Sequence, residues 1–267
     1  MISIDNLTVE FGVRPLFHHV NFVINDRDRI ALVGKNGAGK STMLKIICGL
    51  QKPTSGSIAI PNDTTIGYLP QVMKLTDETT VREEARKAFL HHTEMKARIE
   101  HLQQEMAHRT DYESDDYLSL VEEFTQEHDR FMMMGGDNYE AELERILVGL
   151  GFTHDDLERP TREFSGGWRM RIELAKILLQ QPDVLLLDEP LEGLAPIIVE
   201  ELTDAIGQMS REDGMALVLV EQFAEVALGL TRDALIIERG MIAHQAPSAA
   251  LMQDSDTLER YLGLKLG

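Results

Sequence analysis

A glycine-rich run near the N-terminus, residues 34–41, restricts the possible folds more than any other part of the sequence. It reads GKNGAGKS and matches the pattern G-x-x-x-x-G-K-[ST]. The apolar residues 29–33 precede it, and an apolar segment from about residue 41 to residue 50 follows it. This order predicts a buried strand, a turn and a helix. In such a turn, glycines let backbone N–H groups curl around phosphate oxygens at the helix N-terminus, so the run predicts a phosphate-binding loop.

Two side chains at the end of this loop extend the prediction to a nucleoside triphosphate with Mg²⁺. Lys40 supplies a positive charge near the β- and γ-phosphates, and Ser41 offers a hydroxyl to Mg²⁺. The residues expected to bind the ligand are Gly34, Asn36, Gly37, Ala38, Gly39, Lys40, Ser41 and Thr42.

A second motif is an apolar strand that ends in two acids. Residues 184–187 read VLLL, and Asp188 and Glu189 follow them. Beside a phosphate-binding loop, Asp188 is expected to hold Mg²⁺ through water, and Glu189 is expected to orient or deprotonate the attacking water. Helix capping by Asp188 is the structural alternative, although capping needs no second acid.

The remaining pattern is typical of an α/β protein. Residues 2–4, 6–11 and 20–24 alternate apolar and polar side chains, which predicts antiparallel strands. After residue 164, strands and helices alternate, which predicts a mostly parallel sheet covered on both faces. The strands expected there are 184–187, 216–220 and 234–238, with a hairpin strand at 241–243. The helices expected there are 167–180, about 196–210, 222–230 and 248–261.

Two helical stripes lie between these parts of the chain. The first covers about residues 81–107 and the second about residues 117–131, with the polar segment 110–116 between them. They predict an antiparallel helical hairpin inserted into the sheet domain. A solvated helical subdomain and a dedicated binding arm are both open interpretations.

Composition narrows the class of protein. The chain has 267 residues, of which 43% are hydrophobic, enough for a sizeable core. Its net charge of −19 works against non-specific attraction to nucleic acid or to an anionic membrane surface. No apolar stretch approaches the roughly 18 residues that a membrane helix needs, so we expect a cytoplasmic protein without direct membrane insertion. The single cysteine, Cys48, cannot form an internal disulfide.

Residues 164–168 read FSGGW and begin an amphipathic helix about twenty residues before Asp188. With the two motifs above, this segment resembles the signature L-S-G-G-Q of ATP-binding cassette (ABC) ATPases. The resemblance implies an α/β P-loop NTPase of the ABC type, with a mostly parallel sheet core, an N-terminal antiparallel β subdomain and a helical subdomain. It further implies that Ser165, Gly166 and Gly167 contact the γ-phosphate of an ATP held by a second cassette, in a head-to-tail homodimer.

The resemblance assigns three further residues. Phe11 matches the aromatic residue that stacks on adenine, and Gln71 matches the Q-loop glutamine that senses Mg²⁺ and water. Gln222 stands where the family's switch histidine is expected, and its amide can donate to the γ-phosphate but carries no charge. Ala195 replaces the aspartate of the D-loop, the segment after Glu189. The implied catalytic residues are Glu189, Gln71 and Gln222, and the implied metal-binding residues are Ser41, Gln71 and Asp188.

The whole chain is thus expected to form one nucleotide-binding domain, residues 1–267. Residues 1–75 and 176–267 are predicted to form the catalytic core with the β subdomain, and residues 76–175 the helical subdomain with its hairpin.

Two subfamilies share the resemblance. Residues 1 to about 190 look like the ABC-F class, soluble proteins with two cassettes, many of which act on ribosomes. Residues from about 191 to 267 are similar to the LivF-type ATPase of branched-chain amino acid importers, whose usual pattern includes this D-loop and a glutamine at the switch position. The sequence therefore predicts an engineered hybrid with a seam near residues 188–191, with a natural mosaic as the alternative.

These resemblances predict an ATPase that hydrolyses Mg-ATP at a dimer interface. Three other functions stay open: the ATP-binding subunit of an amino acid importer, an ABC-F-like ribosome-associated factor, and a nucleotide-binding scaffold with little turnover. The family resemblance implies membrane subunits or the ribosome as partners, and the mixed sequence weakens the expectation of either one.

Overall fold

The structure, a computed structural model, describes residues 1–11, 14–71, 77–112, 114–133, 138–192, 194, 196–212 and 214–263. The chain divides into two units. Residues 1–75 and 164–267 form the core unit, and residues 76–163 form the helical unit.

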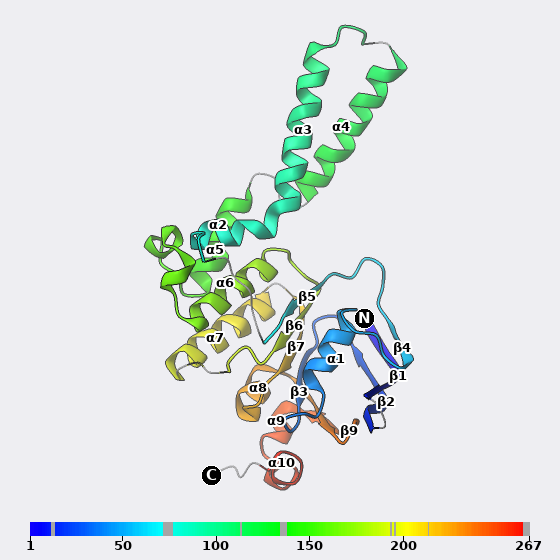
Figure 1. The fold of residues 1–267 in the computed structure, drawn as a ribbon, viewed down its shortest axis with the longest axis vertical. Coiled ribbons are helices and arrows are strands. Elements are labelled where there is room, and N and C mark those ends of the chain that lie inside the picture. The colour runs from blue at the N-terminus through cyan, green and yellow to red at the C-terminus, as the bar shows by residue number, and fades with distance from the viewer. Residues whose placement is uncertain are drawn as a thin grey trace. The chain divides into compact units, whose positions relative to one another are not determined.

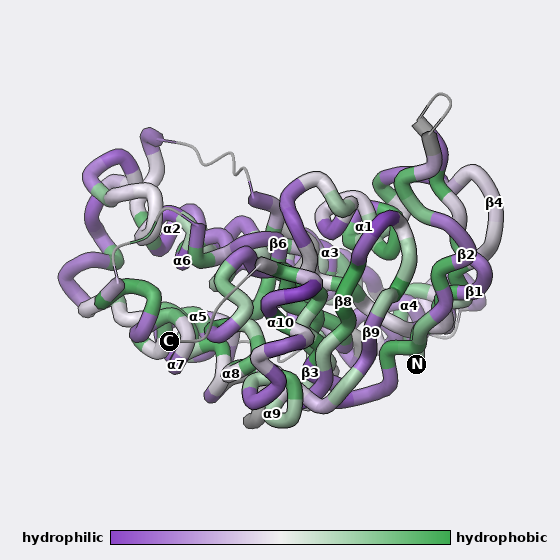
Figure 2. The backbone as a smooth tube through the Cα atoms, turned by 90° about the horizontal axis from the view of Figure 1, so that it is seen from below, coloured by the Kyte–Doolittle hydropathy of each residue, from purple (hydrophilic) through white to green (hydrophobic). Residues whose placement is uncertain are grey.

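The core unit is built on a six-stranded sheet with the strand order β5-β6-β7-β3-β8-β9. Its strands are β3 (Arg29–Val33), β5 (Ile66–Leu69), β6 (Val184–Asp188), β7 (Ala216–Val220), β8 (Asp233–Glu238) and β9 (Met241–Pro247). All neighbours run parallel except β8 and β9, which are antiparallel. Every residue of β6 and β7 is buried, as expected for strands covered on both faces, and green marks such apolar strands in Figure 2, for example β8. The predicted mostly parallel sheet is confirmed.

A second, antiparallel sheet forms the N-terminal part of the core unit. It consists of β2 (Arg14–Ile24), β1 (Ile2–Phe11) and β4 (Ser55–Ala59), in that order. The two segments predicted at 2–4 and 6–11 are one strand with a register shift between Ile4 and Leu7, where Asn6 has a φ of +52°. The strand β4 was not predicted.

Helix α1 (Lys40–Ile47) joins the two sheets, and Figure 1 shows it between them. Its buried residues Met43, Leu44, Ile46 and Ile47 share one apolar cluster with residues of β1 and β2 on one side and of β6, β7 and β8 on the other. The other helices of the core unit are α6 (Gly166–Leu178), α7 (Pro196–Glu212), α8 (Ala224–Leu230), α9 (Ser248–Leu251) and α10 (Ser255–Leu262).

The helical unit contains α2 (Val81–Arg86), α3 (Leu90–His108), α4 (Asp115–Met133) and α5 (Tyr139–Gly149). Helices α3 and α4 pack through the buried residues Met95, Ile99 and Phe131, as the predicted hairpin requires. The predicted continuous helix 81–107 is wrong in one respect, because a 3-10 turn at Lys87–Phe89 separates α2 from α3. Helix α2 begins with a capping box in which Thr80 accepts from the Glu83 N–H and the Glu83 side chain accepts from the Thr80 N–H.

Two boundaries differ from the sequence prediction. The single helix expected at 248–261 is two helices, because the Asp254 side chain accepts from the Thr257 N–H at 3.0 Å and so caps a new helix start. The predicted end of the helical subdomain, residue 175, falls inside the helix expected at 167–180; in the structure the helical unit ends at residue 163, and α6 lies in the core unit, where it packs against β5. Within the described part of the chain, the helices are all too short or too polar to cross a bilayer.

Candidate nucleotide-binding site

The topology brings the candidate residues to one edge of the sheet. The P-loop follows β3, Asp188 ends β6 with Glu189 directly after it, and Gln222 follows β7. These three strands are parallel neighbours, so their carboxyl ends meet, which is where open α/β sheets place ligands.

The P-loop takes its shape from two glycines. Gly37 and Gly39 have φ angles of +78° and +99°, a region that residues with a Cβ rarely enter. A Cβ on Gly39 would also lie 2.6 Å from the Phe17 ring, so the glycine lets the loop pass close to β2. Lys40 then begins α1. The loop therefore ends at a helix N-terminus with free N–H groups, as the sequence predicts.

Lys40 lies among acceptors at the base of this loop. Its ammonium donates to the backbone oxygen of Gly34 at 2.9 Å and lies 3.8 Å from a carboxylate oxygen of Glu189. Lys40 is 4% exposed and Glu189 is 8% exposed, so the pair is largely withdrawn from water. A buried ion pair of this kind contributes little net stability, because the cost of desolvating the two charges offsets their attraction. The position of Lys40 is therefore better explained by a role in ligand binding.

Asp188 accepts hydrogen bonds from two hydroxyl groups. Ser41 Oγ donates to one carboxylate oxygen at 2.8 Å, and Tyr68 Oη donates to the other at 3.2 Å. Burial raises the pKa of Tyr68, and the Asp188 charge raises it further. Tyr68 was not predicted. These partners differ from those of a helix cap, so the capping alternative for Asp188 is wrong.

Glu189 is held by two glutamine amides. Gln71 Nε2 donates to Glu189 Oε2 at 3.1 Å, and Gln222 Nε2 donates to the same oxygen at 2.9 Å. Both amides also donate to the Glu192 carboxylate. The distance from Gln71 Nε2 to Glu192 Oε2 is 2.5 Å, and that from Gln222 Nε2 to Glu192 Oε1 is 3.4 Å. The backbone of Glu189 has a φ of +53°, an unusual conformation for a residue with a side chain, and such strain is commonest at functional sites. Glu192 is a site residue that the sequence reasoning missed.

Lys40, Ser41, Glu189 and the two glutamines line one pocket of about 550 Å³. Its lining residues are Leu16, Asn36, Gly37, Gly39, Lys40, Ser41, Thr42, Gln71, Glu189, Glu192 and Gln222. Most of the residues predicted from the P-loop, the acidic strand end, the Q-loop and the switch position thus come together. Leu16 also lines the pocket and was not predicted, because no sequence pattern marks an apolar strand residue as part of a binding site.

Asp188 and Gly34 do not line this pocket themselves and meet it through their bonds to Ser41 and Lys40, and Ala38 is likewise outside its lining. The remaining predicted residues lie away from its lining or outside the described residues. Ser165 is the N-cap of α6 and makes no capping hydrogen bond there, and Gly166 and Gly167 form the first turn. A Cβ on Gly167 would lie 2.7 Å from Leu194, so this turn packs closely on the segment after Glu192. The side chain of Phe11 and the whole of Ala195 lie outside the described part, and their predicted roles stay predictions.

Comparison with known proteins decides the family. Residues 17–192 match the ABC transporter family of ATP-binding domains, and that match covers most of the chain and both phosphate-site motifs. The chain belongs to the ABC transporter family. It is an ABC ATPase domain, and the fold predicted from its sequence is confirmed.

Relatives of this ABC domain include two kinds of protein. It is 38% identical to the putative ATP-binding protein YdiF of Bacillus subtilis over 73% of this chain, and 34% identical to ABC transporter F family member 5 of Arabidopsis thaliana over 79%. The chain spans only 30% of the length of each. It is 29% identical to the branched-chain amino acid transport ATP-binding protein BraG of Pseudomonas aeruginosa over 98% of this chain and all of BraG.

Solved structures agree on the fold. A nucleotide-free ATP-binding cassette from an ABC transporter aligns with all of this chain and 99% of its own, with a TM-score of 0.71 and 18% identity. A dimeric bacterial ABC transporter cassette covers 93% of this chain with a TM-score of 0.66 and 20% identity.

Proposed function

We propose that this chain binds Mg-ATP in the P-loop pocket and hydrolyses it where two copies of the chain meet. The observation that carries the proposal is the convergence on one pocket of a buried lysine, a hydroxyl paired with Asp188, and a carboxylate, Glu189, held by two amides. A positive charge, a metal-binding pair and a base are the parts that phosphoryl transfer to water requires.

The residues present fit a magnesium ion. Mg²⁺ is usually bound through one or two carboxylates together with substrate phosphates and waters, rather than by a full protein cage. Ser41 Oγ and Asp188 Oδ1 lie 2.8 Å apart at the pocket, and the described residues contain no cluster of three metal-binding side chains. Ser41 and Asp188, with Gln71 beside them, would hold the ion, which neutralises negative charge on the β- and γ-phosphates.

The chain's own residues divide the remaining work. The P-loop N–H groups and Lys40 bind the phosphates, and Lys40 can do so when the γ-phosphate replaces part of its contact with Glu189. Glu189 orients the attacking water and accepts its proton. Gln71 and Gln222 hold that carboxylate by their amides and so fix its direction.

The position of the signature residues Ser165, Gly166 and Gly167 supports hydrolysis in a dimer. The pocket lining includes no residue of 165–167 among those that the structure describes, and Ser165 caps α6 without a side-chain hydrogen bond to its first turn. A helix N-terminus of this kind attracts anions such as phosphate. A γ-phosphate in one copy would be contacted by Ser165, Gly166 and Gly167 of another, which is the head-to-tail arrangement expected from the sequence.

Phosphate release from Mg-ATP, measured over a range of protein concentrations, tests this proposal. We expect turnover per chain to rise with concentration, because each site needs two copies, and to fall roughly 10²- to 10⁴-fold in Glu189→Gln. Glu100→Gln, an exposed substitution of the same type on α3, serves as the matched control and should leave turnover unchanged. ATP binding without turnover at any concentration would refute the proposal and favour the scaffold function.

One relative favours a second function, that of an importer subunit. BraG matches the chain over nearly its whole length, and by its name it is an amino acid transport ATP-binding protein. The ABC-F function has less support, because the chain spans only 30% of YdiF. Stimulation of turnover by the membrane subunits of a BraG-type importer, and not by ribosomes, would decide for the importer.

We further propose that the chain is a hybrid of these two subfamilies, with its seam near residues 188–191. Two groups of relatives with different coverage support this proposal. It fails if one natural genome encodes the same continuous reading frame.

A further inference from the structure

A buried glutamate that the mechanism has not used lies directly before Gln222. Glu221 follows β7 and is 1% exposed. Carboxylates are rarely buried this fully without partners. Glu221 Oε1 accepts from the Leu191 N–H at 2.8 Å, and Oε2 accepts from the Gln222 N–H at 3.2 Å. Its carboxylate therefore joins two separate loops.

The first of these loops carries the proposed catalytic base. Leu191 lies two residues after Glu189 and is itself 1% exposed, so the hydrogen bond to Glu221 is inaccessible to water. The Glu189 N–H donates to the Val220 oxygen at 2.9 Å, which fixes the start of the loop. The positive φ of Glu189 persists only if its surroundings impose it, and Glu221 supplies the next fixed point along the chain.

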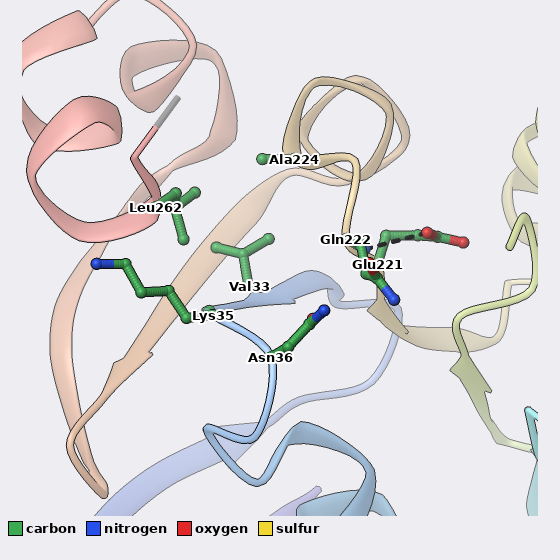
Figure 3. A pocket seen from close by; sticks show the side chains of 8 residues that line it. Val33, Lys35, Asn36, Glu221, Gln222, Ala224 and Leu262 are labelled. Atoms are coloured by element: carbon green, nitrogen blue, oxygen red, sulfur yellow. Dashed lines mark hydrogen bonds between the residues drawn. The ribbon is translucent and has the colours of Figure 1, made fainter. Parts of the chain in front are cut away.

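The second loop carries the amide that holds this base. Gln222 donates to Glu189 through its side chain and to Glu221 through its backbone. Figure 3 shows Glu221 and Gln222 at the wall of a neighbouring pocket of about 260 Å³, with their hydrogen bond dashed. Glu221, Leu191, Glu189 and Gln222 thus form a closed ring of contacts across the ends of β6 and β7.

We propose that Glu221 is a positioning residue for ATP hydrolysis, whose carboxylate ties the Glu189 loop to the backbone of Gln222 and so sets the direction of the base. This role rests on the proposed function of Glu189 and Gln222. Glu221 does not touch the P-loop phosphates in this scheme and acts only through its neighbours. An error of about 1 Å in the position of a reacting group can cost about a hundredfold in rate, so a loosened ring affects turnover more than ATP binding.

The protonation state of Glu221 gives the ring a pH dependence. Burial raises the pKa of Glu221 to about 7, the two backbone N–H groups lower it, and the charges of Glu189 and Glu192 raise it. A cation on this wall belongs to Lys35, which lines the pocket of about 260 Å³ together with Glu221, and Figure 3 shows its side chain extended away from Glu221 on the side of Leu262. Protonation turns one of the two acceptor oxygens into a hydroxyl, which is a weaker acceptor, so the ring strengthens as pH rises through about 7 and weakens below it.

Glu221→Gln tests the proposal because it keeps the shape and leaves a single acceptor oxygen for two N–H groups. We expect the kcat for ATP hydrolysis to fall at least tenfold at pH 8 while the affinity for ATP changes less than twofold. Between pH 6 and pH 8 the wild-type kcat should rise, and in Glu221→Gln it should stay flat. Glu225→Gln, an exposed substitution on α8 four residues along, controls for the loss of charge.

Amide hydrogen exchange gives a second measurement that does not depend on turnover. In Glu221→Gln, exchange at Leu191 or at Gln222 should accelerate at least tenfold, since one of the two N–H groups loses its acceptor. Unchanged exchange at both amides, or a kcat and pH profile like those of the wild type, overturns the proposal. A wild-type chain without turnover refutes the proposed function instead, and the exchange result then still decides whether Glu221 ties the two loops.

Discussion

Replacing the buried carboxylate of Glu221 by an amide should alter the pH dependence of stability in a calculable way. Burial raises the pKa of Glu221 from an ordinary 4.5 to about 7. The folded chain therefore binds this proton more tightly than the unfolded chain, and the free energy of unfolding falls as pH rises between these two values. The full cost is about 3 kcal/mol, of which about 2 kcal/mol arises between pH 5.5 and pH 8.

Glu221→Gln cannot titrate and avoids this cost. Relative to the wild type it should gain about 2 kcal/mol on going from pH 5.5 to pH 8, which corresponds to roughly 4–8 °C in melting temperature for a unit of this size. The assay is thermal unfolding of both proteins, without nucleotide and at matched ionic strength, at the two pH values. The comparison uses only the change between the two pH values, so any constant effect of the lost hydrogen bond cancels.

Glu225→Gln is again the matched control, and its melting temperature should differ from that of the wild type by the same amount at both pH values. A Glu221→Gln difference that is also independent of pH would refute the reasoning, because it would mean that Glu221 titrates in the folded chain as it does in the unfolded one.

Two further substitutions test local structure. Gly39→Ala places a Cβ at a φ of +99° and 2.6 Å from the Phe17 ring, so it should cost about 1–3 kcal/mol of stability and abolish ATP binding, measured by thermal unfolding and calorimetry. Gly49→Ala, at a φ of +71° with no atom near the new Cβ, separates backbone strain from the clash and should keep ATP binding. Thr80→Ala removes the capping box of α2 and should lower stability by about 1 kcal/mol, whereas Thr80→Ser should restore most of it; equal stabilities of the two would contradict the capping role.

The central sheet could be predicted from the sequence because its strands have a clear apolar pattern. Residues 184–188 and 216–220 are short apolar runs that are buried throughout, as is typical of strands in a parallel sheet covered on both faces. The weaker predictions concerned the ends and breaks of helices. Residues 248–261 have a helical pattern throughout. They are divided by the competing hydrogen bond that the Thr257 N–H donates to the Asp254 carboxylate, rather than by any break in that pattern.

The site was predictable where a motif is local and unpredictable where it depends on contacts distant in sequence. Lys40 and Ser41 stand in one eight-residue pattern, and Asp188 follows an apolar strand. Tyr68 donates to Asp188 across 120 positions of sequence, from the neighbouring strand β5, and Glu192 shares the two amides that hold Glu189. A tyrosine on a strand or a glutamate in a loop has no sequence signal for such a role, since the pairing of β5 with β6 creates it.

Stability alone does not explain why residue 221, at the carboxyl edge of the sheet, is a glutamate. A glutamine there would fill the same space without a buried charge, and the wild-type carboxylate is expected to cost about 3 kcal/mol at neutral pH. Groups that lower stability in this way are characteristic of sites where activity limits the choice of residue. What the carboxylate provides and the amide cannot is a second acceptor oxygen, and the two N–H groups that need it belong to Leu191 and Gln222. The energetic cost and the geometry therefore point to the same requirement, that the loops after β6 and β7 be tied together beside Glu189.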